Sequence, residues 1–196
     1  RLTFEDSPSS EEPLILYAKV RNAGEKVVDI QVDKSSVEEV YYVYAGGGLD
    51  SVWTDPAKAV QRADKQTGVV LNRAQQYVWE RGNMKTQITL NTTDIPEIIR
   101  TASLDVQNLQ NGLGDSAKVT DLTGCSLENV LYEVSAQRAV IARTGSDSSV
   151  VIVGYDQYNT YLLDPSTGEV KPYGMNDSTA LFKNAGNMFI TYLEQK

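Results

Sequence analysis

Five strand-length apolar segments, separated by short turns, fill the last sixty residues and constrain the fold more than any other feature of the sequence. They read RAVIART, SSVVIVGY, NTYLLDP, GEVKPYG and NMFITYLE, and turns such as GSD, DQY and STG separate the first four. Short connections join antiparallel neighbours, because a parallel crossover needs a dozen residues or more. We therefore predict a meandering, mainly antiparallel sheet, with a short helix over STALFKNAG before the last strand.

Two helical patterns precede this sheet. The segment IPEIIRTASLDVQNLQNG spaces apolar residues from Ile98 to Leu109 by three or four positions and stops at Gly112, and SLENVLYEVSAQ repeats this spacing after Ser126, a plausible N-cap. Helices followed by a sheet within about one hundred residues predict an α+β domain whose helices pack on one face of the sheet.

The first half of the chain predicts a smaller, strand-rich α+β module. Strands are expected in VEEVYYVYAGGGLDSVW, GVVL and QYVWERG, and a helix in TDPAKAVQRADKQTG, with Thr54 or Asp55 as N-cap and Pro56 at its first position. LILYAKV and EKVVDIQV predict a further hairpin. The predicted core of the module comprises Val60, Ala63, Val69, Val70, Val78 and Trp79.

Changes in composition along the sequence predict a division of the chain into three regions. Residues 1–13 are acidic and polar with two prolines, which is typical of a flexible tail, residues 14–90 form the N-terminal module, and residues 91–196 form the second domain after the junction LNTTDIP. Because the sequence begins at Arg1, we expect a fragment or processed form whose targeting segment is not visible.

The charge and hydropathy of the chain limit the classes of partner that we expect. Its net charge is −8 at pH 7, residues 91–196 carry −6, and no basic stripe is present, so a nucleic-acid partner is not expected. No apolar run approaches the ~20 residues that span a bilayer, so no membrane-spanning segment is predicted in this chain.

The most informative feature of the composition is that the chain contains no histidine and one cysteine, Cys125. A single thiol excludes an internal disulfide and multi-thiolate metal sites, and the lack of imidazole removes Ser-His and Cys-His couples. We expect no cofactor and no metal: the carboxylates Asp147, Asp156 and Asp164 lack the alternate spacing of a calcium loop.

Three stretches, LTGCSLENVLYEVSAQRAVIA, SSVVIVGYDQYNTYLLDPSTGEV and LFKNAGNMFITYL, resemble C39-like, papain-type cysteine peptidase domains of bacterial surface proteins. The resemblance covers roughly residues 95–196. It implies a papain-like fold, with helices packed on an antiparallel sheet, preceded by the small strand-rich module. In that family a cysteine at a helix N-terminus acts with a histidine and an orienting Asp or Asn.

The resemblance assigns a position in this chain to each member of that triad. The histidine falls on Ser148, six residues before Gly154, and the orienting carboxylate falls on Asp164. The nucleophile is placed at Ser103 in TASLD. These are vestigial positions, and no catalytic residue is expected. Ser148 would be a hydroxyl that bonds to nearby backbone or to Asp164, and Asp164 is either a triad remnant or a turn residue in DPSTG.

Cys125 has two interpretations. It is either a displaced nucleophile near a helix start or a small buried apolar residue, and we favour burial because no base can be named for it. We therefore expect a pseudo-peptidase, a non-catalytic binding or structural module of a larger bacterial cell-surface or secreted protein, with a peptide or another protein as partner. The alternatives are a peptidase or hydrolase that uses Cys125 or Ser103 with a carboxylate, and a spacer without a ligand.

Overall fold

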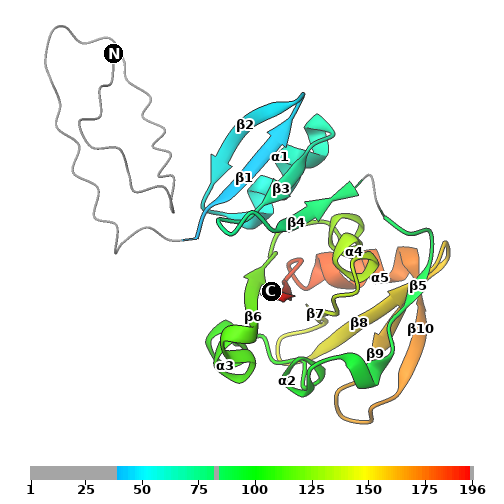
Figure 1. The fold of residues 1–196 in the computed structure, drawn as a ribbon. Coiled ribbons are helices and arrows are strands. Elements are labelled where there is room, and N and C mark those ends of the chain that lie inside the picture. The colour runs from blue at the N-terminus through cyan, green and yellow to red at the C-terminus, as the bar shows by residue number, and fades with distance from the viewer. Residues whose placement is uncertain (1–38, 82–83, 195–196) are drawn as a thin grey trace, which may run out of the picture. The chain divides into compact units, whose positions relative to one another are not determined.

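The computed structural model describes residues 39–81 and 84–194, which belong to one compact unit with two antiparallel sheets (Figure 1). The predicted tail and the predicted hairpin of LILYAKV and EKVVDIQV lie outside the described residues. The architecture is α+β, as the sequence predicts. The predicted boundary at residue 90 stays a prediction, and residues 88–89, on its N-terminal side, already pair with the larger sheet.

The first sheet has four strands in the order β2-β1-β3-β4. They are β1 (Tyr41–Ala45), β2 (Gly48–Trp53), β3 (Val69–Leu71) and β4 (Tyr77–Glu80). Helix α1 (Pro56–Gln66) packs against this sheet, and its N-cap Asp55 accepts a hydrogen bond from the backbone N–H of Lys58. Of the six predicted core residues only Val69 is partly exposed, because its side chain lies on the opposite face from Val70.

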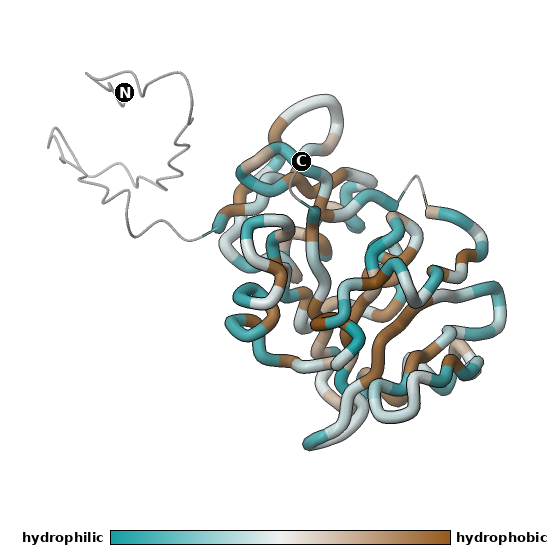
Figure 2. Tube along the Cα trace, turned by 60° about the horizontal axis from the view of Figure 1, so that its bottom comes forward, coloured by the Kyte–Doolittle hydropathy of each residue, from teal (hydrophilic) through white to brown (hydrophobic). Residues whose placement is uncertain are grey.

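The larger sheet has the path β10-β9-β8-β7-β11-β6, and every pair along it is antiparallel. Its strands are β5 (Ile88–Thr89), β6 (Ala117–Asp121), β7 (Val140–Arg143), β8 (Ser149–Tyr155), β9 (Asn159–Leu163), β10 (Val170–Gly174) and β11 (Phe189–Glu194). The short strand β5 pairs with β8 and is not part of the linear strand order. The four strands β7 to β10 form the predicted meander, and Figure 2 shows the apolar residues concentrated along its inner strands.

The helices of the second half differ from the prediction at one place. A short 3-10 turn, η3 (Thr92–Asp94), is followed by two separate helices, α2 (Glu97–Arg100) and α3 (Val106–Leu113), where the spacing predicts one helix. The chain is interrupted because Ala102 takes a left-handed conformation with φ 53°, and Asp105 then caps α3. A second 3-10 turn, η4 (Gly114–Ser116), leads into β6.

The remaining two helices agree with the sequence. Helix α4 (Leu127–Ser135) begins at its N-cap Ser126, whose hydroxyl accepts a hydrogen bond from the N–H of Asn129, and α5 (Met175–Asn184) precedes β11. Trp79 of the first sheet donates from its indole nitrogen to the carbonyl of Asn129 at 2.8 Å, so α4 contacts both sheets. Buried apolar residues from both sheets form a single cluster.

Candidate functional site

The segments that carry the three vestigial positions meet at one end of the larger sheet. The Ser149 hydroxyl donates a hydrogen bond to the carbonyl of Ala102, which brings the α2–α3 connection to the start of β8. Leu163 pairs with Val151 across β8 and β9, so Asp164 follows β9 beside the first residues of β8. The structure therefore brings together the chain segments that contain Ser103, Ser148 and Asp164.

Their side chains, in contrast, make separate local bonds. The hydroxyl of Ser148 accepts from Thr144 at 2.9 Å within the exposed turn between β7 and β8. Asp164 accepts from the N–H of Ser166 at 2.8 Å and from its hydroxyl at 2.6 Å. Ser103 accepts from the N–H of Asp105 at 3.3 Å. Within residues 39–81 and 84–194, no hydrogen bond joins any two of the three side chains.

Ser103 lies outside a helix, contrary to its placement at a helix start. It follows the left-handed Ala102 and precedes the N-cap Asp105, so it belongs to the connection between α2 and α3. A nucleophile at a helix N-terminus gains acidity from the helix dipole and from unpaired backbone N–H groups. Ser103 does not occupy that position, because Asp105 is the N-cap of α3 and accepts from the N–H of Asn108.

Asp164 has the electrostatics of a turn carboxylate. The hydroxyl and the backbone N–H of Ser166 hold the pKa of Asp164 below its ordinary value, because both groups donate to its charged form. The backbone N–H of Gly168 also donates to the carbonyl of Asp164 at 2.8 Å, which closes the DPSTG turn. The Asp164 carboxylate therefore already accepts hydrogen bonds from groups of its own turn.

Cys125 is fully buried, directly before the N-cap of α4. Burial, together with the nearby carboxylates of Glu133, Asp55 and Asp121, raises the pKa of its thiol to about 12. A helix N-terminus favours a thiolate, yet here the loss of water and the acidic neighbours outweigh it. The Cys125 thiol is therefore un-ionised at neutral pH.

Hollows in the surface near these segments are lined by other residues. The turn between β7 and β8 forms one of about 380 Å³ through Thr144, Gly145 and Ser146, together with Leu181 and Asn184 of α5. In the described part of the chain no cluster of three acidic or sulfur side chains could hold a metal ion. None of the helices in that part is long and apolar enough to cross a bilayer.

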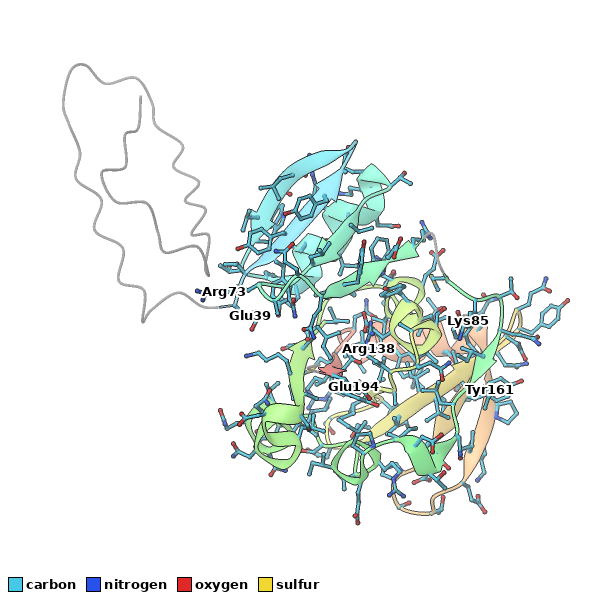
Figure 3. All side chains as sticks on the ribbon, in the orientation of Figure 1. Glu39, Arg73, Lys85, Arg138, Tyr161 and Glu194 are labelled. Atoms are coloured by element: carbon cyan, nitrogen blue, oxygen red, sulfur yellow. The ribbon has the colours of Figure 1, made fainter. Side chains whose placement is uncertain are left out.

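Two features of the structure are absent from the predictions made from the sequence. One is the bond from Ser149 to Ala102, which depends on a contact between residues 47 positions apart. The other is a buried ion pair, in which Glu133 of α4 accepts from Arg138 at 2.7 Å (Arg138 is labelled in Figure 3). Glu133 falls on the apolar face of its helix, three residues after Val130, and that placement is a sequence signal for it.

Comparison with known proteins adds little to this geometry. No protein-family model matches the sequence, and no curated protein matches it. One solved structure, of a protein from Bacillus anthracis provisionally described as a C39-like peptidase, is similar to 46% of this chain and 57% of that chain, with 21% identity and a TM-score of 0.40. The match spans less than two thirds of that protein, and a likeness this low establishes neither a shared fold nor a shared activity.

Proposed function

We propose that the chain is a non-catalytic binding or structural module, built on a papain-like scaffold that has lost its peptidase chemistry. One observation carries the proposal: the only thiol of the chain, Cys125, is fully buried with its pKa raised to about 12. The sequence also contains no histidine. A thiol or hydroxyl nucleophile needs a base that removes its proton, and the chain offers no imidazole for that role.

The bonds at the vestigial positions support the same conclusion. A working triad needs three groups in mutual hydrogen-bonding reach, with the third member orienting the base. Ser148 bonds to Thr144, Asp164 bonds to Ser166, and Ser103 caps its own loop. We place the module in a larger bacterial surface-attached or secreted protein, a proposal that rests on the sequence resemblance alone.

Thiol reactivity distinguishes this proposal from a cysteine peptidase. A chloromethyl-ketone peptide probe should label native Cys125 slowly between pH 7 and 9, because the thiol is buried and un-ionised. Labelling should accelerate in concentrations of urea that unfold the protein. The variant Cys125→Ala confirms the site by losing the label. Rapid labelling of the folded protein, with a rate that follows an apparent pKa below 9, would show an activated nucleophile and overturn the proposal.

A serine hydrolase is tested separately. A quenched fluorescent peptide library should show no turnover above buffer with the wild-type chain. Any turnover that Ser103→Ala abolishes, while Ser116→Ala leaves it unchanged, would assign catalysis to Ser103. Ser116 is a suitable control, because it is an exposed serine whose hydroxyl donates locally to the carbonyl of Leu113.

A further inference from the structure

A groove between β2 and α1 combines positive charge with an aromatic ring. It has a volume of about 420 Å³ and is lined by Trp53 and Ser51 from the strand and by Lys58, Gln61, Arg62 and Lys65 from the helix. Its lining contains three cations and no carboxylate, although the whole chain carries a net charge of −8. The groove thus gathers cations, of which Arg62 and Lys58 pair with carboxylates beside it.

The strand side of the groove is held in place by a chain of hydrogen bonds. The Trp53 indole N–H donates to Ser51 at 2.8 Å, and the Ser51 hydroxyl donates to Asp50 at 2.8 Å. Arg62 then binds both oxygens of Asp50 at 2.7 Å, which connects β2 to α1. The donation from Arg62 lowers the pKa of Asp50, so this connection persists at neutral pH. The indole ring is thus oriented before any partner binds.

The two lysines of the groove remain available for a partner. Lys58 and Lys65 are exposed, and Lys65 has no ion pair within residues 39–81 and 84–194. Lys58 lies 3.5 Å from Asp55, and because the lysine side chain is 64% exposed and the aspartate side chain 43% exposed, this pair stabilises little. Seven residues of helix separate the lysines by about 10 Å along one face.

These features favour an acidic peptide segment as the ligand of the groove. In an extended polyproline II segment, residues three positions apart lie on the same face and about 9 Å apart, so carboxylates at that spacing match the separation of the lysines. An apolar side chain between them would lie against the face of Trp53, which is partly buried and fixed in orientation. β2 is also the outermost strand of its sheet among the described residues, so an extended segment can approach along it (Figure 1).

We propose that the β2–α1 groove binds an extended acidic segment of a protein partner, with carboxylates on Lys58 and Lys65 and an apolar side chain on Trp53. This inference rests on the proposed role of the chain as a binding module and assigns its partner a chemistry. The groove differs from the cleft that a peptidase would use, since it shares no residue with the segments around Ser103, Ser148 and Asp164.

The test uses a fluorescein-labelled octapeptide, Glu-Glu-Leu-Glu-Glu-Leu-Glu-Glu, titrated with the full chain and followed by fluorescence anisotropy. We expect saturable binding that weakens as salt rises, because exposed charges are screened. The double variant Lys58→Glu/Lys65→Glu should bind roughly tenfold more weakly or worse. Lys171→Glu/Lys183→Glu, which makes the same change of net charge at two exposed lysines outside the groove, is the matched control and should leave the affinity unchanged.

Trp53→Ala should also weaken binding, whereas Trp53→Phe should retain most of it because an aromatic face remains. Circular dichroism of each variant confirms that the fold is intact. The proposal is overturned if the peptide does not bind, if Lys58→Glu/Lys65→Glu binds like wild type, or if inorganic polyphosphate competes as well as the peptide. Those results would leave the Cys125 labelling and the turnover assays unaffected, so failure of the groove and failure of the non-catalytic role are distinguishable.

Discussion

The pKa of Asp164 distinguishes a carboxylate that belongs to a turn from one that belongs to a functional cleft. Ser166 is the first cause of the lowered pKa of Asp164. We predict that Ser166→Ala raises this pKa toward the ordinary value of about 3.9. The shift is measured by following the Asp164 carboxyl carbon in an NMR pH titration. Ser103→Ala is the control and should leave the pKa of Asp164 unchanged, because no bond joins the two side chains in the described structure.

The sign of the corresponding stability change follows from the direction of the shift. A pKa that is lower in the folded chain means that folding favours the charged carboxylate. The contribution of Asp164 is therefore present above its ordinary pKa and disappears as the pH falls through the lowered value. Wild type should exceed Ser166→Ala in stability at neutral pH, and the two should converge in acid. A shift of the Asp164 pKa in Ser103→Ala would instead place both residues in one functional cleft.

The reason for a glycine at position 154 is visible in the structure but not in the sequence. The strand VVIVGY is predictable from its apolar run, but the reason for its glycine is not. A Cβ atom at position 154 would lie 2.6 Å from the carbonyl oxygen of Ile88 and 3.0 Å from the Cα of Thr89. Both atoms belong to the backbone of β5, which pairs with β8 there. A two-residue strand has no sequence pattern of its own, so this constraint appears only in three dimensions.

At the scale of elements, one side chain of α3 completes the hydrogen bonding of β6, an outer strand of the larger sheet. The Gln110 amide of α3 donates to the carbonyl of Ala117 and accepts from the N–H of Val119, each at 2.9 Å. It thereby satisfies the open edge of β6. We predict that Gln110→Leu lowers the free energy of unfolding by about 1–2 kcal/mol, because two partly buried backbone groups lose their partner. Urea unfolding measures this change.

A second glutamine on the same helix provides the control for that prediction. Gln107 makes one exposed bond, to Asn111 at 2.9 Å, so Gln107→Leu should change stability by less than about 0.5 kcal/mol. Equal effects of the two substitutions would mean that Gln110 acts through helix propensity alone. The edge of β6 would then be satisfied in another way.

The elements that were predictable are those with local signals at their ends. Asp55, Pro56 and Ser126 mark the starts of α1 and α4 because capping depends on the residues of the first turn. The break at Ala102 was not predictable, since alanine rarely adopts the left-handed conformation that ends α2. Strand β6 was missed as well. Its sequence, AKVTD, has little apolar character, and it forms by pairing with β11 far along the chain.

At the scale of the whole molecule, contacts distant in sequence join the first sheet to the rest of the described structure. Arg81, after β4, pairs with Glu128 of α4, and the Gln76 side chain donates to the carbonyl of Glu194 at 2.9 Å. Patterns within each half predict its strands and its main helices. They do not predict these joins, because each one needs two residues that are positioned by different sheets.

The buried ion pair joins Glu133 of α4, a helix that contacts both sheets, to Arg138, which follows that helix. One carboxylate oxygen of Glu133 and one terminal nitrogen of Arg138 are buried without a hydrogen-bond partner in the described structure. We predict that Arg138→Met lowers the free energy of unfolding by about 3–5 kcal/mol, because it leaves the carboxylate of Glu133 buried alone. Glu133→Leu/Arg138→Met removes both charges and should recover most of that loss. Arg100→Met, at an exposed arginine, is the control.

The pH dependence makes this prediction specific to charge. Burial raises the pKa of Glu133, and Arg138 opposes the rise. Without Arg138 the raised pKa means that the folded chain binds a proton more tightly than the unfolded chain, so stability is present in acid and lost as pH rises through that value. Urea unfolding at pH 5 and pH 8 should therefore show a larger deficit for Arg138→Met at pH 8, and none of this pH dependence in the double variant. An equal deficit at both values would assign the loss to packing of the arginine side chain against Tyr132, whose ring centre lies 5.8 Å from the guanidinium carbon.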